Sequence, residues 1–525
     1  MSTKETYVVA GGGLAGAKAA ETLRSEGFVG RIVIVGDEAE HPYERPPLSK
    51  EYLRGEAEAR PFVHDKNFYA EHEIELELGV AVSAIDPASS EVIIGNQSLR
   101  YDRLLIAVGA EPRRLRLPGS ELDGVHYLRD LHNSEAIGER FAGGARVVVI
   151  GAGWIGAEVA ASARQKGCEV TLLARTAVPL ERVLGPEVGA VYRDLHRSHG
   201  VEFLPQASAA RFEGERSVRR VVTQDGRAID ADLVVVGVGV VPRTVLAEEA
   251  GLEVENGIAV TERLETSAPG VFAAGDVANA HHPFYGRRLR VEHWANALNQ
   301  GPAAARAMLG HPVSYDEIPY FFSDQYEAGM EYGGFATEWD EVVFRGAPED
   351  GEFIAFWLRG ERVVAGMNFN VWDVNEEIRE LLRSRQAVDR HRLADRDTPL
   401  EEVRALGFGE RARRFLAGRL NYAWRVTTVR LARGADVSPA ELAPGEGRIL
   451  NVEGERMAVH RAEDGTLHGV SPVCTHLGCL VEFNGAEKTW DCPCHGSRFR
   501  PDGSVIRGPA RKPLKAKTIS IDAAG

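Results

Sequence analysis

The stretch YVVAGGGLAG, residues 7–16, decides the fold class more than any other part of the chain. Its apolar residues predict a buried strand, and its glycines predict a tight turn. The alanine-rich run after the glycines predicts a helix. In such a unit the first glycine makes the turn, the second lets backbone approach a pyrophosphate, and the third lets helix and strand pack closely. The stretch therefore predicts the start of a dinucleotide-binding βαβ unit.

A second stretch, RVVVIGAGWIG at residues 146–156, repeats this pattern. An apolar run that ends in glycine follows each unit, at residues 101–109 after the first and at residues 231–239 after the second. Residues 266–276 are the last segment of this pattern. The simplest interpretation is one nucleotide-binding domain interrupted by another, with the chain returning to finish the first. After residue 319, alternating strands and a helix over residues 375–386 predict an α+β domain.

The predicted fold class is α/β, with two Rossmann-like domains, then an α+β domain and a small all-β domain. With 525 residues the chain is longer than one hydrophobic core usually supports. The predicted boundaries are 1–115 with 240–315 for the first nucleotide-binding domain, 116–239 for the second, 316–405 for the α+β domain, and 426–525 for the all-β domain. The arginine-rich residues 406–425 are the predicted linker.

Charge and hydropathy indicate which partners and which cellular location to expect. The net charge of -15 argues against binding to nucleic acid or to an anionic membrane. The N-terminal apolar run enters a glycine loop at once, which leaves no room for a signal peptide, and no apolar stretch is long enough to span a bilayer. The sequence therefore predicts a cytoplasmic protein.

The cysteines predict a metal centre near the C-terminus. Four of the five cluster within residues 474–494, among histidines, whereas a disulfide scaffold would spread them along the chain. Cys474 and His476, followed by Cys492 and His495, fit the pattern of a Rieske [2Fe-2S] cluster, in which two thiolates bind one iron and two imidazoles the other. A structural zinc site and packing cysteines are the alternatives.

The residue at the end of the second strand differs between the two βαβ units. In the first unit Asp37 follows the strand and is suited to hydrogen-bond a ribose hydroxyl. In the second unit Ala174 and Arg175 stand there instead, and an arginine can pair with a 2′-phosphate. This favours NADPH over NADH at the second site, the alternative being that Arg175 is simply solvated.

Several motifs in order resemble a known family. They are the first glycine loop, PYERPPLSK at residues 42–50, GAE at 156–158, AGD at 274–276, VEHWANA at 291–297 and PYFFSDQY at 319–326. Residues 6–405 thereby resemble the FAD-dependent ferredoxin reductases that serve cytochromes P450 and ring-hydroxylating dioxygenases, and the related apoptosis-inducing factors. The resemblance implies a glutathione-reductase-like fold that binds FAD and NAD(P)H.

The resemblance also implies roles for individual residues. Lys50 and Glu158 match an ion pair beside the flavin and nicotinamide, Phe322 stacks near the nicotinamide, and Trp294 lies at the flavin edge. The remaining FAD-binding residues are Gly11, Gly13, Ala15 and Gly16 at the pyrophosphate, Asp37 at the ribose, Arg45 along the flavin, Val82 and Arg129 near the adenosine half, and Asp276 on the ribityl chain. Gly151, Gly153, Gly156, Arg175, Gly239 and Glu292 complete the predicted cofactor-binding set.

The chain lacks the Cys-x4-Cys pair that a thiol–disulfide reductase of the glutathione-reductase kind needs after the first glycine loop. This argues against that chemistry, and electrons are expected to leave the flavin singly. The chain also departs from the family that it resembles at two positions. The family commonly has glutamate where this chain has Ala174, and often tryptophan where it has Phe322. Phenylalanine can also stack on a nicotinamide, and packing in the core is the alternative role of this ring.

The C-terminal segment resembles Rieske proteins in which two further cysteines, here Cys479 and Cys494, form a disulfide between the cluster loops. Ser497 lies where a hydroxyl bonds a cluster sulfur and raises the reduction potential, and Phe499 replaces a tyrosine that often does the same. The resemblance implies a potential above that of low-potential Rieske ferredoxins and below that of respiratory Rieske proteins.

The sequence as a whole predicts an NAD(P)H-dependent flavoprotein reductase. Electrons would pass from FAD to the chain's own Rieske cluster and then to an external acceptor, a cytochrome P450 or a ring-hydroxylating oxygenase. One alternative is an apoptosis-inducing-factor-like protein whose redox state gates partner binding. The other is a flavin oxidase with a regulatory Rieske domain. The chain is expected to be a monomer or a homodimer.

Overall fold

The computed structural model describes residues 5–57, 59–403, 438–452, 454–476, 478–485, 487–492 and 496–519. The chain divides into two compact units, Met1–Met330 and Glu331–Gly525, and each is described by itself. The predicted linker, residues 406–425, lies outside the described residues. No helix within the described ranges is long and apolar enough to cross a membrane.

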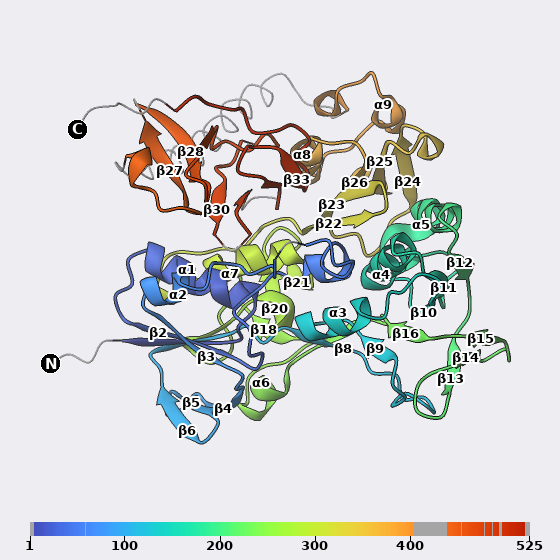
Figure 1. The fold of residues 1–525 in the computed structure, drawn as a ribbon, viewed down its shortest axis with the longest axis horizontal. Helices are drawn as coiled ribbons and strands as arrows, with labels where there is room; N and C mark the ends of the chain where they lie inside the picture. The colour runs from blue at the N-terminus through green and yellow to red at the C-terminus, as the bar shows by residue number, and fades with distance from the viewer. Residues whose placement is uncertain are drawn as a thin grey trace. The chain divides into compact units, whose positions relative to one another are not determined.

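The first unit contains a parallel sheet built around the first glycine loop (Figure 1). Its strand order is β19-β7-β1-β2-β3, so β1 lies at the centre and its apolar residues are fully buried. Helix α1 (Leu14–Ser25) follows the loop and packs against α7 (Trp294–Met308). The strands are β1 (Thr6–Ala10), β2 (Arg31–Gly36), β3 (Ile74–Leu78), β7 (Arg103–Ile106) and β19 (Val271–Ala273).

The second parallel sheet of this unit lies between β7 and β19 in the chain. Its order is β12-β11-β10-β16-β9, with β10 directly before the second glycine loop. The strands are β9 (Val125–Tyr127), β10 (Arg146–Ile150), β11 (Glu169–Leu173), β12 (Glu202–Leu204) and β16 (Leu233–Val236), and the helices are α3 (Leu131–Gly138), α4 (Trp154–Gln165) and α5 (Glu181–Ser198). The first sheet thus takes its last strand from beyond the second sheet.

Smaller elements complete the first unit. Antiparallel ribbons are formed by β4 (Val82–Asp86), β5 (Glu91–Ile94) and β6 (Gln97–Arg100), by β13 (Ala209–Glu213), β14 (Arg220–Thr223) and β15 (Ala228–Asp230), and by β8 (Ala110–Pro112) with β17 (Val240–Pro242). Strands β18 (Ile258–Val260), β20 (Ala278–His282) and β21 (Arg287–Arg290) form a further sheet. Helices α2 (Phe68–Glu71) and α6 (Val245–Glu249) and strand β22 (Tyr320–Gln325) are the remaining elements.

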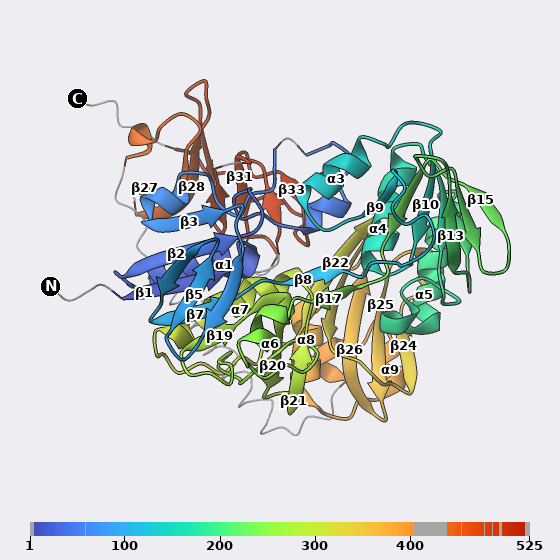
Figure 2. The same ribbon diagram turned by 90° about the horizontal axis from the view of Figure 1, so that it is seen from below.

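The second unit begins with an antiparallel sheet in the order β23-β26-β25-β24, and α8 packs on β26 (Figure 2). Helix α8 ends two residues earlier than predicted, because Arg385 takes a left-handed conformation. The elements are β23 (Ala328–Gly334), β24 (Glu341–Arg345), β25 (Phe353–Arg359), β26 (Arg362–Phe369), α8 (Asn375–Ser384) and α9 (Arg390–Ala394).

The C-terminal part of the second unit is all β. It has a sheet of β27 (Gly447–Val452), β28 (Glu455–Arg461) and β29 (Leu467–Val470), and a second of β30 (Glu482–Asn484), β31 (Thr489–Asp491), β32 (Arg498–Phe499) and β33 (Val505–Arg507). Trp490 and Phe499 are fully buried and pack in one core with Cys474 and Cys492. The predicted fold class is confirmed.

Helix α5 carries a buried histidine in its last turn. His196 is fully buried, and its Nδ1 lies 3.2 Å from the hydroxyl of Tyr326. Burial lowers the pKa of His196 to about 4, although the Gln325 side chain opposes this shift. Protonation is therefore disfavoured in the folded protein relative to the unfolded chain, where the pKa is near its ordinary value.

This shift predicts a loss of stability in mild acid. The unfolded chain binds the proton more tightly than the folded protein does. The free energy of unfolding therefore falls by about 3 kcal/mol through His196 as the pH falls from about 6.5 to about 4. The variant His196→Asn keeps a hydrogen-bonding side chain without the titration. Thermal unfolding midpoints measured between pH 7 and pH 4 should fall less in the variant than in the wild type, and parallel curves would contradict the prediction.

Candidate functional site

The two glycine loops have the same backbone design. A Cβ built on Gly11 would overlap the carbonyl of Ala107, and one on Gly16 would overlap the carbonyl of Gly11. A Cβ on Gly13, directly before α1, would meet no atom within 4 Å. The first and third glycines are thus required by packing, whereas the second opens space at the helix N-terminus. That space fits a pyrophosphate, because the free N–H groups there attract anions.

The second loop matches the first residue for residue. A Cβ on Gly151 would overlap the carbonyl of Gly237, and one on Gly156 would overlap the carbonyl of Gly151. Gly153 precedes α4 and again has open space beside it. The structure therefore has two dinucleotide cradles, one at each central strand.

A buried ion pair lies between segments far apart in the sequence. Lys50 Nζ is 3.0 Å from Glu158 Oε2, and both side chains are about 95% buried. The Ser49 hydroxyl donates to the same carboxylate oxygen, and the Ser323 hydroxyl donates to Oε1 at 2.7 Å. Lys50 Nζ also donates to the Pro46 carbonyl at 3.2 Å. Both charges are thus paired and hydrogen-bonded, as burial requires.

Aromatic rings lie beside this ion pair. The ring of Phe322 is 5.6 Å from Lys50 Nζ, and Trp294 contacts it edge-on with centroids 6.0 Å apart. The indole nitrogen of Trp294 is buried and has no hydrogen-bond partner within the described part of the chain. Such a group ordinarily finds an acceptor, and a bound cofactor could supply one. The structure therefore brings together Lys50, Glu158, Phe322 and Trp294, as the proposed roles require.

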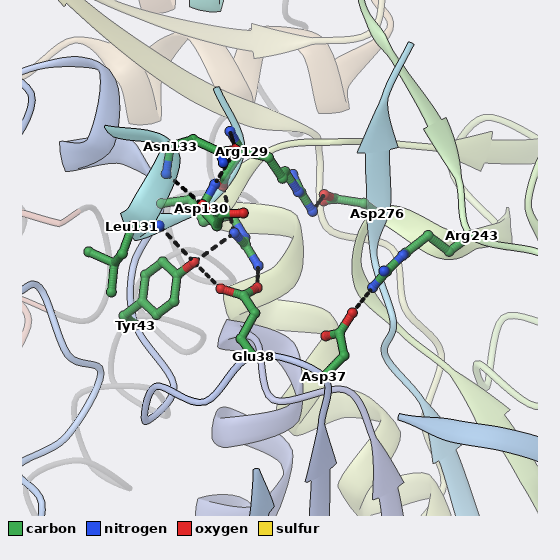
Figure 3. A network of polar contacts seen from close by, with 10 residues as sticks. Asp37, Glu38, Tyr43, Arg129, Asp130, Leu131, Asn133, Arg243 and Asp276 are labelled. Atoms are coloured by element: carbon green, nitrogen blue, oxygen red, sulfur yellow. Dashed lines mark hydrogen bonds and ion pairs between the residues drawn. The ribbon is translucent and has the colours of Figure 1, made fainter. Parts of the chain in front are cut away.

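A second polar network includes Glu38, Tyr43, Arg129 and Leu131 (Figure 3), and Arg45 lies at its centre. The Arg45 guanidinium donates to Glu38 Oε1 and to the Arg129 carbonyl at 2.6 Å each, and to the Tyr43 hydroxyl at 3.0 Å. The Tyr43 hydroxyl in turn donates to Glu38 and accepts from the Leu131 amide. Burial alone would lower the pKa of Arg45, but the neighbouring Tyr43 and Glu38 outweigh it and raise that pKa.

Two carboxylates predicted to bind FAD have cationic partners in the same view (Figure 3). Asp276 Oδ2 accepts from Arg129 at 3.2 Å. Asp37 Oδ2 lies 2.7 Å from Arg243, the residue directly after β17. Burial lowers the pKa of Arg129, and so does the nearby Arg45, while Asp276 opposes the shift. Each aspartate retains a second oxygen that could accept from a ligand hydroxyl.

The other predicted residues are spread over the first unit. Ala15 is buried in α1, Val82 begins β4, and Gly239 (φ +99) precedes β17. Arg175 is exposed after β11, and Glu292 pairs with Arg290. Sequence reasoning missed the contacts of Glu38, Tyr43, Ser49, Ser323 and Arg243. Tyr43, Ser49 and Ser323 lie within motifs already singled out, whereas nothing in the sequence pairs Arg243 with Asp37.

The predicted cluster loops share one backbone pattern. Cys474 donates its amide to the Cys479 carbonyl at 2.7 Å and accepts from Gly478 at 3.0 Å. Cys492 donates to the Ser497 carbonyl at 2.7 Å and accepts from Gly496 at 3.0 Å. Both cysteine side chains are buried, and two thiolates are a donor set that suits iron. His476 is also buried, and His495 lies outside the described residues.

The further cysteines and Ser497 belong to the same loops. Cys479 is disulfide-bonded, and its predicted partner Cys494 lies outside the described residues. The Ser497 hydroxyl is fully buried and accepts from the Ala510 amide at 3.1 Å, which leaves its own hydrogen free to be donated. A bond from Ser497 to a cluster sulfur remains a prediction.

Three family models match the chain. They are Pyridine nucleotide-disulphide oxidoreductase over residues 5–301, Reductase C-terminal over 320–404, and Rieske [2Fe-2S] domain over 434–518. The chain is 37% identical over 418 residues to putidaredoxin reductase CamA of Pseudomonas putida, covering 78% of this chain and 99% of that protein. It is 38% identical over 401 residues to the anthranilate 1,2-dioxygenase system ferredoxin--NAD(+) reductase component of Burkholderia cepacia, covering 74% and 97%.

A solved structure matches as well. This chain is similar to a chain of the covalent putidaredoxin reductase–putidaredoxin complex, with a TM-score of 0.73 and 37% identity. The match covers 76% of this chain and 98% of that chain.

The buried ion pair yields a test of the site's architecture. Lys50→Met leaves the Glu158 carboxylate buried without its cation, and we expect a loss of about 3–5 kcal/mol of stability. The double variant Lys50→Met with Glu158→Gln should recover part of this loss, because no unpaired charge remains. Thermal unfolding of the ligand-free proteins measures both effects. A loss in the double variant equal to the sum of the losses in Lys50→Met and in Glu158→Gln would show that the two groups are not energetically coupled.

Proposed function

This chain belongs to the pyridine nucleotide-disulphide oxidoreductase family, as an FAD-dependent ferredoxin reductase extended by a Rieske domain, and from that premise we propose how its electrons travel. It is an oxidoreductase, and its family models assign it FAD, a pyridine nucleotide and a [2Fe-2S] cluster. The proposal is that electrons from NAD(P)H pass through FAD to the chain's own cluster and then to an external acceptor.

The observation that carries this proposal is the presence of both redox sites in one chain. The first unit has two dinucleotide cradles with space beside Gly13 and Gly153. The second unit has buried Cys474, His476 and Cys492 in matching loops. Covalent linkage replaces diffusional encounter with a high effective concentration, so electron transfer within the chain competes well with transfer between molecules.

The residues of the first unit would hold and polarise the cofactors. Bound FAD supplies the conversion of a two-electron hydride donor into single electrons. The helix N-terminus after Gly13 would bind its pyrophosphate, and Asp37 its ribose. Lys50 would stabilise negative charge on the reduced ring, held in place by Glu158. Phe322 would stack near the nicotinamide, which the loop beginning at Gly151 would receive.

The external acceptor is proposed by analogy. The relatives are named for putidaredoxin reduction and for dioxygenase systems, so a cytochrome P450 or a ring-hydroxylating oxygenase component is the proposed partner. The domain boundaries stated above, the cytoplasmic location and a monomeric or homodimeric state are part of the same proposal.

Anaerobic stopped-flow mixing with NADH or NADPH tests the proposed route. Flavin bleaching should come first, and the visible bands of the Rieske cluster should then change within the same reaction. A Cys492→Ser variant, which lacks one iron ligand, should retain flavin bleaching and lose the later phase. A wild-type cluster that stays oxidised while the flavin is fully reduced would exclude transfer within the chain.

The exposed Arg175 predicts a preference for NADPH, although several relatives are named for NAD(+). Replacing it by alanine should remove a charge-assisted contact to the 2′-phosphate. The ratio of kcat/KM for NADPH to that for NADH should fall about tenfold, as expected from losing one such bond. Arg182→Ala, a nearby control on α5, should leave the ratio unchanged. An unaltered ratio in Arg175→Ala would refute the proposed preference.

A further inference from the structure

We propose that residues 370–374, between β26 and α8, are the docking site of the chain's own Rieske domain and cover its His476 edge. Residues 370–374 form the docking loop. The inference rests on the proposed function, because it takes His476 to be a ligand of the Rieske cluster. All the contacts that carry it lie within the second unit.

The first contact is a stacked pair. The guanidinium carbon of Arg511, in the all-β domain, lies 4.0 Å from the ring centroid of Trp372 in the docking loop. A cation over the face of tryptophan is attracted by the ring quadrupole, and more strongly where water is excluded. The pair joins two parts of the chain that are separated by more than a hundred residues.

The second contact lies at the cluster histidine itself. His476 Nε2 is 4.0 Å from Glu331 Oε1 and 4.0 Å from Asp373 Oδ1, and the side chains of His476 and Glu331 are both fully buried. The Thr475 hydroxyl donates to the Lys512 carbonyl at 2.5 Å, which ties the cluster loop to the segment that carries Arg511. Contacts with His476 and Arg511 therefore engage one continuous edge of the all-β domain.

Hydrogen bonds from its own domain also hold the docking loop in shape. Asn368 Nδ2 donates to the Val371 carbonyl at 2.6 Å and to Glu331 Oε2 at 3.0 Å, so one amide fixes both the loop and the buried carboxylate. Asn370 Nδ2 donates to the Gly351 carbonyl at 3.0 Å. Asn370 and Asp373 both have positive φ, at +53° and +64°, a conformation that persists where its surroundings enforce it. Preorganisation of this kind lowers the entropic cost of binding.

Charge also favours the chain's own domain as the occupant. Residues 498–517 contain seven Lys or Arg and one acidic residue, in a chain whose net charge is -15. The docking loop and the first turn of α8 supply Asp373, Glu376 and Glu377. Complementary charge fixes the register of an interface and suppresses wrong partners.

Docking has a consequence for electron delivery. While the docking loop covers His476, an external protein has no access to that edge of the domain. The Rieske domain must leave the docking loop before a protein acceptor can use this edge. The chain therefore has a closed arrangement, in which the docking loop covers His476, and an open arrangement, in which a partner can reach this edge.

Hydrogen–deuterium exchange of the full-length holoprotein tests the docking. In the wild type, residues 370–374 and 508–512 should both be protected. Trp372→Ala or Arg511→Ala should each speed exchange in both segments by about fivefold, the factor for losing about 1 kcal/mol of a cation–π contact. The double variant should show no further increase, because both changes remove one interaction. Trp372→Phe should retain most of the protection, and Arg500→Ala, an exposed control on the same domain, all of it.

A second measurement tests access to the cluster. Protein reduced with dithionite, without nicotinamide, is mixed with the acidic blue-copper protein plastocyanin, and reoxidation of the cluster is followed. Trp372→Ala and Arg511→Ala should react about fivefold faster than the wild type, whereas the rates with ferricyanide, a small oxidant, should match.

The outcomes separate this inference from the proposed route. Substitutions that alter exchange only in their own segment, or plastocyanin rates equal in all variants, would overturn the docking. Neither measurement requires electrons to come from the flavin. The docking can therefore hold even if nicotinamide fails to reduce the cluster, and it can fail while that reduction proceeds.

Discussion

The buried pair of Lys50 and Glu158 is the interaction on which the arrangement of the first unit depends. Lys50 lies in the segment between β2 and β3, Glu158 lies on the helix after the second glycine loop, and Ser323 belongs to β22. Two buried charges are costly unless every lone pair and proton is used. Here two hydroxyls and a backbone carbonyl complete the pairing, so the two cradles and β22 are held in one geometry.

The paired glycine loops show how the same physical requirement recurs. In each loop two glycines are required because a carbonyl lies where a Cβ would be, and one is required because a ligand must approach. The cysteine loops of the second unit repeat their own backbone bonds in the same way. Duplicate local structure thus builds each of the two regions, and the two glycine-loop units differ after their second strands, where one has Asp37 and the other Arg175.

Much of this could be predicted from the sequence, because glycine spacing and strand periodicity are local. The fold class, the family and the cluster motif are confirmed. The apolar runs at 101–109 and 231–239 extend beyond β7 and β16, and in each run a residue past the strand, Ala107 or Gly237, lies against the first glycine of the loop in the same sheet. The contacts of Ser323 with Glu158 and of Arg243 with Asp37 span more than 160 residues, and no local pattern encodes them.

The connection of the first sheet also constrains biosynthesis. Strand β19 pairs with β7 across more than 160 intervening residues, whereas every strand of the second sheet lies between them in the chain. As the ribosome releases the polypeptide from its N-terminus, the strands of the inner sheet are all available before β19 emerges. The outer sheet meanwhile exposes an unpaired edge at β7, the kind of surface that recruits chaperones or aggregates. A domain interrupted by another therefore makes the early nascent chain dependent on a strand translated much later.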